Sequence, residues 1–330
     1  MSFVLLPASF AVLLAGAYFF TNAVEWAGHR LRLAEGAVGS LLAAVGTALP
    51  ESIIPVIALI TGGRADDVAV GAIIGAPFML ATIAMALVAV SAFAFRDRRP
   101  RGAAIQAHTP TLVRDLGFFL VLFTIALALG LGAPQPLRIA AAVAFVALYA
   151  VYVHLTLRGG GGMQAATSLK PLYLDSSRDS PPANAAIALQ LLVALGAIVG
   201  GSRLFVDELL HVADRVGVSA LVLALVLAPI ATELPEKANS FLWTREGKDT
   251  LALGNITGAM VFQSTLPVAL GLALTDWTLS GPSLLAAALG IAGGALALLL
   301  LRFRGRFGLP AVLGWAGLYG GFTAYVAASG

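Results

Sequence analysis

Long stretches of mainly apolar residues, each of roughly 20 residues or more, follow one another through almost the whole of this 330-residue chain. An α-helix needs a stretch of that length and polarity to cross the hydrocarbon core of a membrane. Apolar types make up 59% of the residues and charged types 11%, and the mean hydropathy is +0.92. Because a soluble domain averages about 45–50% apolar and 25% charged residues, the composition excludes a soluble protein. It predicts an all-α integral membrane protein in contact with the lipid bilayer.

We expect about ten transmembrane helices. The second and seventh are the weakest assignments, because each carries carboxylates and prolines within the span. A Gly/Ser/Pro-rich segment, 158–184, separates the fifth span from the sixth and is typical of a flexible linker. The expected spans are 3–24, 37–61, 67–94, 115–132, 137–157, 185–206, 217–243, 250–274, 281–301 and 309–328.

The basic residues are distributed unequally over the two sides of the expected membrane. Fifteen of the 20 Lys and Arg residues follow odd-numbered spans, and four follow even-numbered spans. Since basic residues accumulate on the cytoplasmic side, both termini are predicted to lie outside, and the linker in the cytoplasm. The excess of Arg over Lys hints at a GC-rich bacterial genome, so a bacterial inner membrane is the expected location. The basic residues are dispersed between apolar runs, and we expect no nucleic acid partner.

Two short motifs occur twice and in the same order. Leu-Pro-Glu at 49–51 recurs at 234–236, and Gly-x-Ile-x-Gly-Ala at 71–76 recurs at 254–259. The recurrence predicts a duplication in which each half has five spans, and because five is odd the halves have opposite orientations. Inverted repeats with interrupted helices near the membrane midplane are typical of secondary transporters. The expected units are a first repeat 1–157, a cytoplasmic linker 158–184 and an inverted second repeat 185–330.

Three acidic residues fall inside the expected spans: Glu51, Glu233 and Glu236. A carboxylate at the bilayer centre costs about 2.5–3.5 kcal/mol on insertion scales, and such residues usually serve a function. A protonated, hydrogen-bonded carboxylate between helices is the structural alternative, but packing alone hardly explains a duplicated Pro-Glu pair. Glu233 has no counterpart in the first half, and for this residue both alternatives stay open.

Further oxygen ligands accompany the duplicated acids. Pro50 and Pro235 donate no N–H, which leaves the carbonyls four residues earlier, those of Gly46 and Ala231, without helical partners. We therefore expect broken second and seventh helices. The hydroxyls of Thr47 and Thr232 lie four residues before the glutamates on the same helical face. Carboxylate, carbonyl and hydroxyl oxygens together are the ligand set of a hard cation such as Ca²⁺.

Residues 46–51 (Gly-Thr-Ala-Leu-Pro-Glu) and 232–236 (Thr-Glu-Leu-Pro-Glu), each followed by a glycine-containing span, resemble the alpha repeats of the calcium/cation antiporter superfamily. The resemblance is greatest to its sodium/calcium exchanger branch. It implies a secondary antiporter that exports Ca²⁺ in exchange for Na⁺ or H⁺, with no cofactor and with inorganic cations as partners. By this resemblance Glu51 and Glu236 are the central ion ligands, and Thr47 and Thr232 line the ion positions.

The sequence departs from the family pattern at several expected ligands. Ala72 and the pair Ala76-Pro77 replace polar residues of the third span, and Ala259-Met260 replaces polar residues of the eighth. Asn255 is kept, and with Gln263 it is a candidate source of an amide oxygen. These changes leave the number of ions bound by the site undetermined.

Lys237 directly follows Glu236 and has two interpretations. The first is that its ammonium fills a position that a sodium ion fills in relatives, which reduces the site's charge from −3 to −2. One divalent cation, two sodium ions or two protons then neutralise the site. The second is that Lys237 points away from the site, because it lies about 100° round the helix from Glu236, and extends toward the membrane surface.

Other function classes remain as alternatives. A proton-driven divalent exchanger, or a monovalent cation/proton exchanger, could use the same carboxylates. A cation channel is the alternative from a different class, in which flux follows the gradient without a counter-ion. A membrane-embedded hydrolase is disfavoured, since the spans lack an arrangement such as Gly-x-Ser-x-Gly or His-x-x-x-His.

Overall fold

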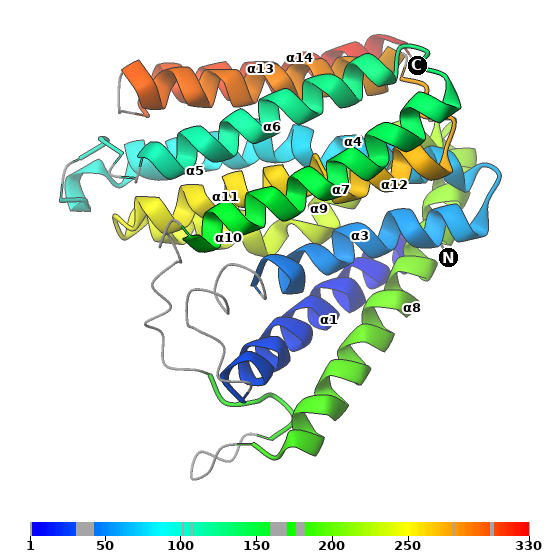
Figure 1. The fold of residues 1–330 in the computed structure, drawn as a ribbon, viewed down its shortest axis with the longest axis horizontal. Helices are drawn as coiled ribbons and strands as arrows, with labels where there is room; N and C mark the ends of the chain where they lie inside the picture. The colour runs from blue at the N-terminus through cyan, green and yellow to red at the C-terminus, as the bar shows by residue number, and fades with distance from the viewer. Residues whose placement is uncertain are drawn as a thin grey trace.

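The computed structural model describes residues 2–30, 43–100, 102–105, 107, 109–158, 170–175, 182–279, 281–303 and 307–329. In this part of the chain the structure is built almost entirely from helices (Figure 1). The first half contains α1 (Ser2–Arg30), α3 (Ala43–Thr61), α4 (Ala65–Met79), the π-helical turn η2 (Leu80–Ala84), α5 (Met85–Ala94), the 3₁₀ turn η3 (Arg96–Arg98), α6 (Thr109–Leu129) and α7 (Gln135–Arg158). The second half contains α8 (Asn184–Val216), α9 (Ala220–Thr232), α10 (Leu234–Arg245), α11 (Asp249–Gln263), α12 (Leu266–Leu274), α13 (Gly281–Phe303) and α14 (Leu309–Ser329).

The helices reproduce the expected spans, with two exceptions. Among the described residues, eight helical stretches are long and apolar enough to cross a membrane, and they correspond to eight of the ten predicted spans. At the seventh span the structure has a shorter apolar helix, α9 (Ala220–Thr232), and at the second span it has α3 (Ala43–Thr61). These are the spans that carry the carboxylates and prolines. The chain is a multi-pass, all-helical membrane protein, and the predicted fold class is confirmed.

Corresponding helices of the two halves pack against each other and run antiparallel. Helices α1 and α8, the first and sixth spans, pair along one edge of the molecule (Figure 1). Between them the ring of Phe10 contacts that of Phe205, and the side chains of Asn22 and Gln190 form a hydrogen bond. Helices α6 and α13, the fourth and ninth spans, also pair. Opposite directions of corresponding helices are what halves of opposite orientation require.

The third and eighth spans form the centre of the molecule. The most apolar windows of Ala65–Ala94 and Asp249–Leu274 are 83% and 72% buried, whereas those of α7 and α14 are 17% buried. Each central span is irregular near its middle: α4 passes through η2 after Pro77, and α11 ends at Gln263 before α12 begins with Pro267 near its start. Exposed apolar side chains on the outer helices, such as Val143 and Phe303, suit contact with lipid.

Helix α4 approaches the backbone of α9 closely, and two glycines permit this contact. A Cβ atom added to Gly71 would lie 2.8 Å from the Cβ of Ala224, and one added to Gly75 would lie 2.8 Å from the Cα of Leu225. Pro229 has no N–H to donate to the Leu225 carbonyl, and Gly75 packs against that carbonyl oxygen. The contact joins the first half to the apolar helix that precedes the Leu-Pro-Glu motif of the second half, residues 234–236.

A short part of the linker holds α1 and α8 together. In this clamp segment (Lys170–Asp175) Leu172 is fully buried among Ala23, Ile187 and their neighbours. Asn22 and Gln190 bond to each other and to backbone groups of the clamp segment. The remainder of the predicted linker lies largely outside the described residues.

A buried ion pair connects other elements. The guanidinium of Arg99 contacts both carboxylate oxygens of Asp249 at 2.9 Å and also bonds backbone carbonyls at Gly102, Ala104 and Thr244. Both side chains are almost completely buried. This pair ties the segment after α5 to the start of α11, so it joins the two halves on the side of the molecule opposite the turn between α3 and α4.

Candidate functional site

The seventh span is interrupted at Glu233, the middle acid of the sequence motif. Helix α9 ends at Thr232 and α10 begins at Leu234, with Glu233 between them at φ −96° and ψ 7°. Pro235 lies at the start of α10, where a missing N–H breaks no helical bond. The predicted break in the seventh span is therefore present, directly beside Glu236.

The second span behaves differently from the expectation. Helix α3 continues from Ala43 to Thr61 through Pro50 and Pro55, so no interruption occurs within the described part of this span. A proline removes one hydrogen bond from a helix and often kinks it, but neighbouring turns can keep the helix continuous. In the second half the additional Pro229 and the polar Glu233 accompany the break.

The three intramembrane acids from the two halves meet at this break. Glu51, Glu233 and Glu236 are 7%, 0% and 2% exposed. The Glu51 carboxylate is close enough to Glu236 and Glu233 for charge repulsion and to Lys237 for attraction, and it also lies near the Gln263 amide. Neither carboxylate oxygen of Glu51 has a hydrogen-bond donor in the structure. A buried carboxylate without donors requires a proton or a cation to compensate it.

Lys237 lies inside this cluster rather than at the membrane surface. Its Nζ donates to Glu233 Oε2 at 2.8 Å and to the Pro229 carbonyl oxygen at 3.1 Å, and the residue is 6% exposed. Helical side chains point toward the N-terminus of their helix, so the ammonium reaches back from α10 to the last turn of α9. There the carbonyl ends of the helix favour a cation.

Gln263 completes the surroundings of Glu233. Its Nε2 donates to Glu233 Oε1 at 3.1 Å, while its own Oε1 is buried and without a donor. Gln263 ends α11 at the irregular point of the eighth span. Both oxygens of Glu233 are thus bonded by protein groups, whereas those of Glu51 are not.

The remaining predicted ligands have various surroundings. Thr232 is buried and donates to the Ala228 carbonyl at 3.1 Å, which leaves its oxygen lone pairs available. Ala231 is buried in the last turn of α9. Asn255 donates from Nδ2 to the Glu236 carbonyl and to Ser240 Oγ, and so fastens α10 to α11. Gly46 lies within α3, but the Thr47 side chain lies outside the described residues.

The side of the helix on which Lys237 lies could have been predicted from the sequence. The adjacent Glu236 is no guide to this side, because neighbouring residues lie about 100° apart round the helix. Pro229, Glu233 and Lys237 are spaced four residues apart, and residues so spaced share one helical face. This spacing persists across the break, where the Lys237 N–H still donates to the Glu233 carbonyl at 3.1 Å. The ion pair of Arg99 with Asp249 had no comparable local signal, since 150 residues separate its members.

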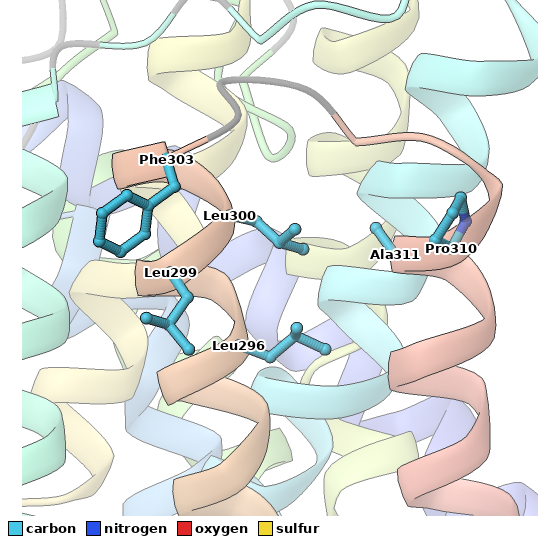
Figure 2. Close-up of a pocket in the computed structure, with 6 residues that line it drawn as sticks. All are labelled: Leu296, Leu299, Leu300, Phe303, Pro310 and Ala311. Carbon is cyan, nitrogen blue, oxygen red and sulfur yellow. The ribbon is translucent and has the colours of Figure 1, made fainter.

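The pocket in Figure 2 does not qualify as a cation site. It lies between α13 and α14, and its volume is about 440 Å³. All six side chains that line it are apolar (Leu296, Leu299, Leu300, Phe303, Pro310 and Ala311). Such a surface fits a hydrocarbon chain rather than an ion.

A further carboxylate lies buried in a span but away from the break. Asp115 of α6 accepts from Thr257 Oγ1 at 3.0 Å and from Arg114 at 3.0 Å, and is 2% exposed. Over the described residues, no group of three or more His, Asp or Glu side chains has the geometry of a ready-made metal centre. Of the acids at the break, Glu233 is already paired with Lys237.

Comparison with known proteins finds relatives whose similarity covers most of the chain. CaxA of Alkalimonas amylolytica, named as a candidate antiporter, is 27% identical over 284 residues, which are 84% of this chain and 82% of CaxA. The inner membrane protein YrbG of Escherichia coli is 26% identical over 239 residues, 72% of this chain and 69% of YrbG. Among solved structures, that of the H⁺/Ca²⁺ exchanger CAX superposes with a TM-score of 0.76 at 19% identity and covers 99% of this chain and 82% of CAX.

The family assignment rests on both halves. The sodium/calcium exchanger protein family model matches residues 1–158 and 186–328, and so includes every acid at the break. It omits residues 159–185, which are almost the whole predicted linker, and the last two residues. The match agrees with the resemblance of the two Leu-Pro-Glu motifs. The chain belongs to the sodium/calcium exchanger protein family, whose members are membrane transporters rather than enzymes.

Proposed function

We propose that this protein is a secondary active antiporter that exports Ca²⁺ in exchange for Na⁺ or H⁺. The observation that supports the proposal most is the meeting of Glu51 from one half with Glu236 from the other in a buried cluster. The two donor-free oxygens of Glu51 fit a site that a cation fills. The family and the names of CaxA and of CAX point to the same activity.

In this proposal, Glu51 and Glu236 are the central ligands. Thr47, Thr232, Asn255, and the carbonyls of Gly46 and Ala231 provide further oxygens. Ca²⁺ takes six to eight oxygen ligands in flexible geometry, and the broken seventh span offers carbonyls as well as carboxylates. Exchange follows because the incoming and outgoing ions compete for the same oxygens.

We also propose how the chain is organised around this site. Residues 1–157 and 185–330 form inverted halves, and 158–184 form a cytoplasmic linker. Inverted halves allow alternating access, since each half can adopt the conformation of the other. The excess of basic residues after odd-numbered spans supports termini on the outside, and the similarity to YrbG supports a bacterial inner membrane.

The test is Ca²⁺ flux in proteoliposomes under an imposed Na⁺ gradient and, separately, under a pH gradient. The native chain is expected to accumulate Ca²⁺ under at least one gradient, which also identifies the coupling ion. Glu51→Gln and Glu236→Gln are expected to lose uptake. Asp115→Asn removes another buried carboxylate and serves as the matched control, with uptake retained.

Two results would count against the proposal. Normal uptake by both glutamine variants would remove Glu51 and Glu236 from the site. Ca²⁺ flux that follows its own gradient with no counter-ion movement would instead indicate a channel.

A further inference from the structure

The pocket between α13 and α14 has the size and lining of a site for a hydrocarbon chain. Its volume of about 440 Å³ lies within the range of about 300–1,000 Å³ that is usual for sites of small molecules. Figure 2 shows Leu296 and Leu300 pointing from α13 toward Pro310 and Ala311 of α14. Leu299, which also lines the pocket, is 53% exposed. The pocket is therefore open on the outer surface of the protein, where a chain can enter from the bilayer.

A basic side chain lies beside this pocket at the end of α13. Arg302 belongs to the last turn of the helix and follows Leu299 by three residues. Residues so spaced are neighbours on the helix surface. Arg302 is exposed, and within the described part of the chain it belongs to no ion pair. Its guanidinium is available to an anionic group that lies against the pocket.

The start of α14 adds to the positive potential at this end of the pocket. The helix begins at Leu309, directly before the pocket residue Pro310, and has no acidic residue in its first turn. The N-terminus of a helix favours a negative charge. By sequence, residues 301–311 contain three arginines and no acid. Two of these arginines, Arg304 and Arg306, lie outside the described residues.

The same end of the pocket lies beside another basic segment. The N–H of Phe307 donates to the Ala103 carbonyl at 3.4 Å, which joins the connection between α13 and α14 to the segment that contains η3. Both segments follow odd-numbered spans, and their basic residues support a cytoplasmic location. The cytoplasmic leaflet carries anionic lipids, and basic pockets between transmembrane helices on this side bind their head groups.

We propose that the pocket between α13 and α14 binds one anionic phospholipid. An acyl chain lies between Leu296, Leu300 and Ala311, and the phosphate pairs with Arg302. Guanidinium and phosphate groups form short, charge-assisted hydrogen bonds. A zwitterionic lipid offers the same chain, but its ammonium is repelled by Arg302, so the site selects by the charge of the head group. This inference adds a lipid site to the proposed antiporter and does not depend on which ions are transported.

The test is native mass spectrometry of the purified full chain in detergent. It measures binding of phosphatidylglycerol, which is anionic, and of phosphatidylcholine, which is zwitterionic, with identical acyl chains. Arg302→Gln removes the partner of the phosphate, and Arg302→Lys keeps a positive charge there. Leu299→Gln makes the wall of the pocket polar.

The end of α7 supplies matched controls. Leu155 and Arg158 have the same three-residue spacing, and both are exposed on an outer helix that does not line the pocket. Leu155→Gln and Arg158→Gln therefore make the same chemical changes at another membrane-facing helix end. They separate a specific site from a general attraction of basic helix ends for anionic lipid.

The native chain is expected to bind its first phosphatidylglycerol about 10-fold more tightly than phosphatidylcholine, which is the factor expected for one hydrogen bond to a charged group. Arg302→Gln is expected to lose this preference, and Arg302→Lys to keep most of it. Leu299→Gln is expected to weaken the binding of both lipids. The two α7 controls are expected to bind both lipids as the native chain does.

Several results would overturn the inference. These are equal binding of the two lipids by the native chain, an unchanged preference in Arg302→Gln, or an equal loss in Arg158→Gln. Thermal unfolding without added lipid shows whether each variant is folded. If Arg302→Gln does not fold, Leu299→Gln decides, because native affinity for phosphatidylglycerol in that variant also overturns the inference. Failure of the antiport function is distinct, since it appears only in the flux assay.

Discussion

Replacement of Gly75 by alanine tests the close approach of α4 to α9. An added Cβ would lie 2.8 Å and 2.9 Å from the Cα and C atoms of Leu225. These are backbone atoms and cannot rotate aside, so the two helices must separate. Overpacking of this kind costs about 1–3 kcal/mol, while alanine regains about 1 kcal/mol of helix propensity over glycine.

The repeat supplies a matched control at Gly258, the counterpart of Gly75. There the nearest described atom to an added Cβ is Tyr152 Oη at 3.9 Å, which is ordinary contact. Since both substitutions share the propensity gain, the difference between them isolates the packing cost of about 1–3 kcal/mol. The assay is thermal unfolding of the purified protein in detergent.

Gly75→Ala is expected to unfold at a lower temperature than Gly258→Ala. Gly258→Ala is expected to unfold at or above the unfolding temperature of the native protein. Equal shifts of the two variants would refute the reasoning, since they would mean that α4 and α9 are not in close contact in the folded protein.

Two further predictions concern contacts away from the ion cluster. Arg99→Leu leaves Asp249 buried without its bidentate partner, so the free energy of unfolding should fall by about 3–5 kcal/mol. The double variant Arg99→Leu/Asp249→Leu should recover part of that loss. Thermal unfolding measures both variants, and a double variant less stable than either single variant would contradict the account. Leu172→Asp places a charge in the apolar contact of the clamp segment with α1 and α8. The rate of backbone hydrogen exchange in the clamp segment should therefore rise. An unchanged rate would contradict the described packing.

Much of the fold was predictable because membrane spans have a local signal. A run of about 20 apolar residues is sufficient to identify a span, and eight predicted spans correspond to long helices in the structure. The second and seventh spans are the weak assignments for a physical reason, since carboxylates and prolines reduce the hydropathy of a span. The break before Leu234 was predicted from Pro235, but the continuity of α3 through Pro50 depends on its surroundings.

Other features depend on contacts between distant residues. The clamp segment lies in a polar linker, and its attachment relies on Asn22 and Gln190, which the sequence does not distinguish from other polar residues. At the site, the acids were identifiable because charge inside a span is rare. For Lys237 the neighbouring Glu236 allows both orientations, but the four-residue spacing from Glu233 favours the inward one.

Ca²⁺ binding to purified protein tests the central claim most directly, namely that acids from the two halves form one site. Calorimetric titration of the native chain is expected to give one Ca²⁺ per chain. Glu51→Gln and Glu236→Gln are each expected to weaken binding by at least about 30-fold, since loss of one member of a buried charge pair costs about 2–5 kcal/mol. The double variant Glu51→Gln/Glu236→Gln should bind Ca²⁺ only slightly more weakly than the single variant with the lower affinity. Native affinity in either single variant, or two independent sites of which each variant loses one, would contradict the account.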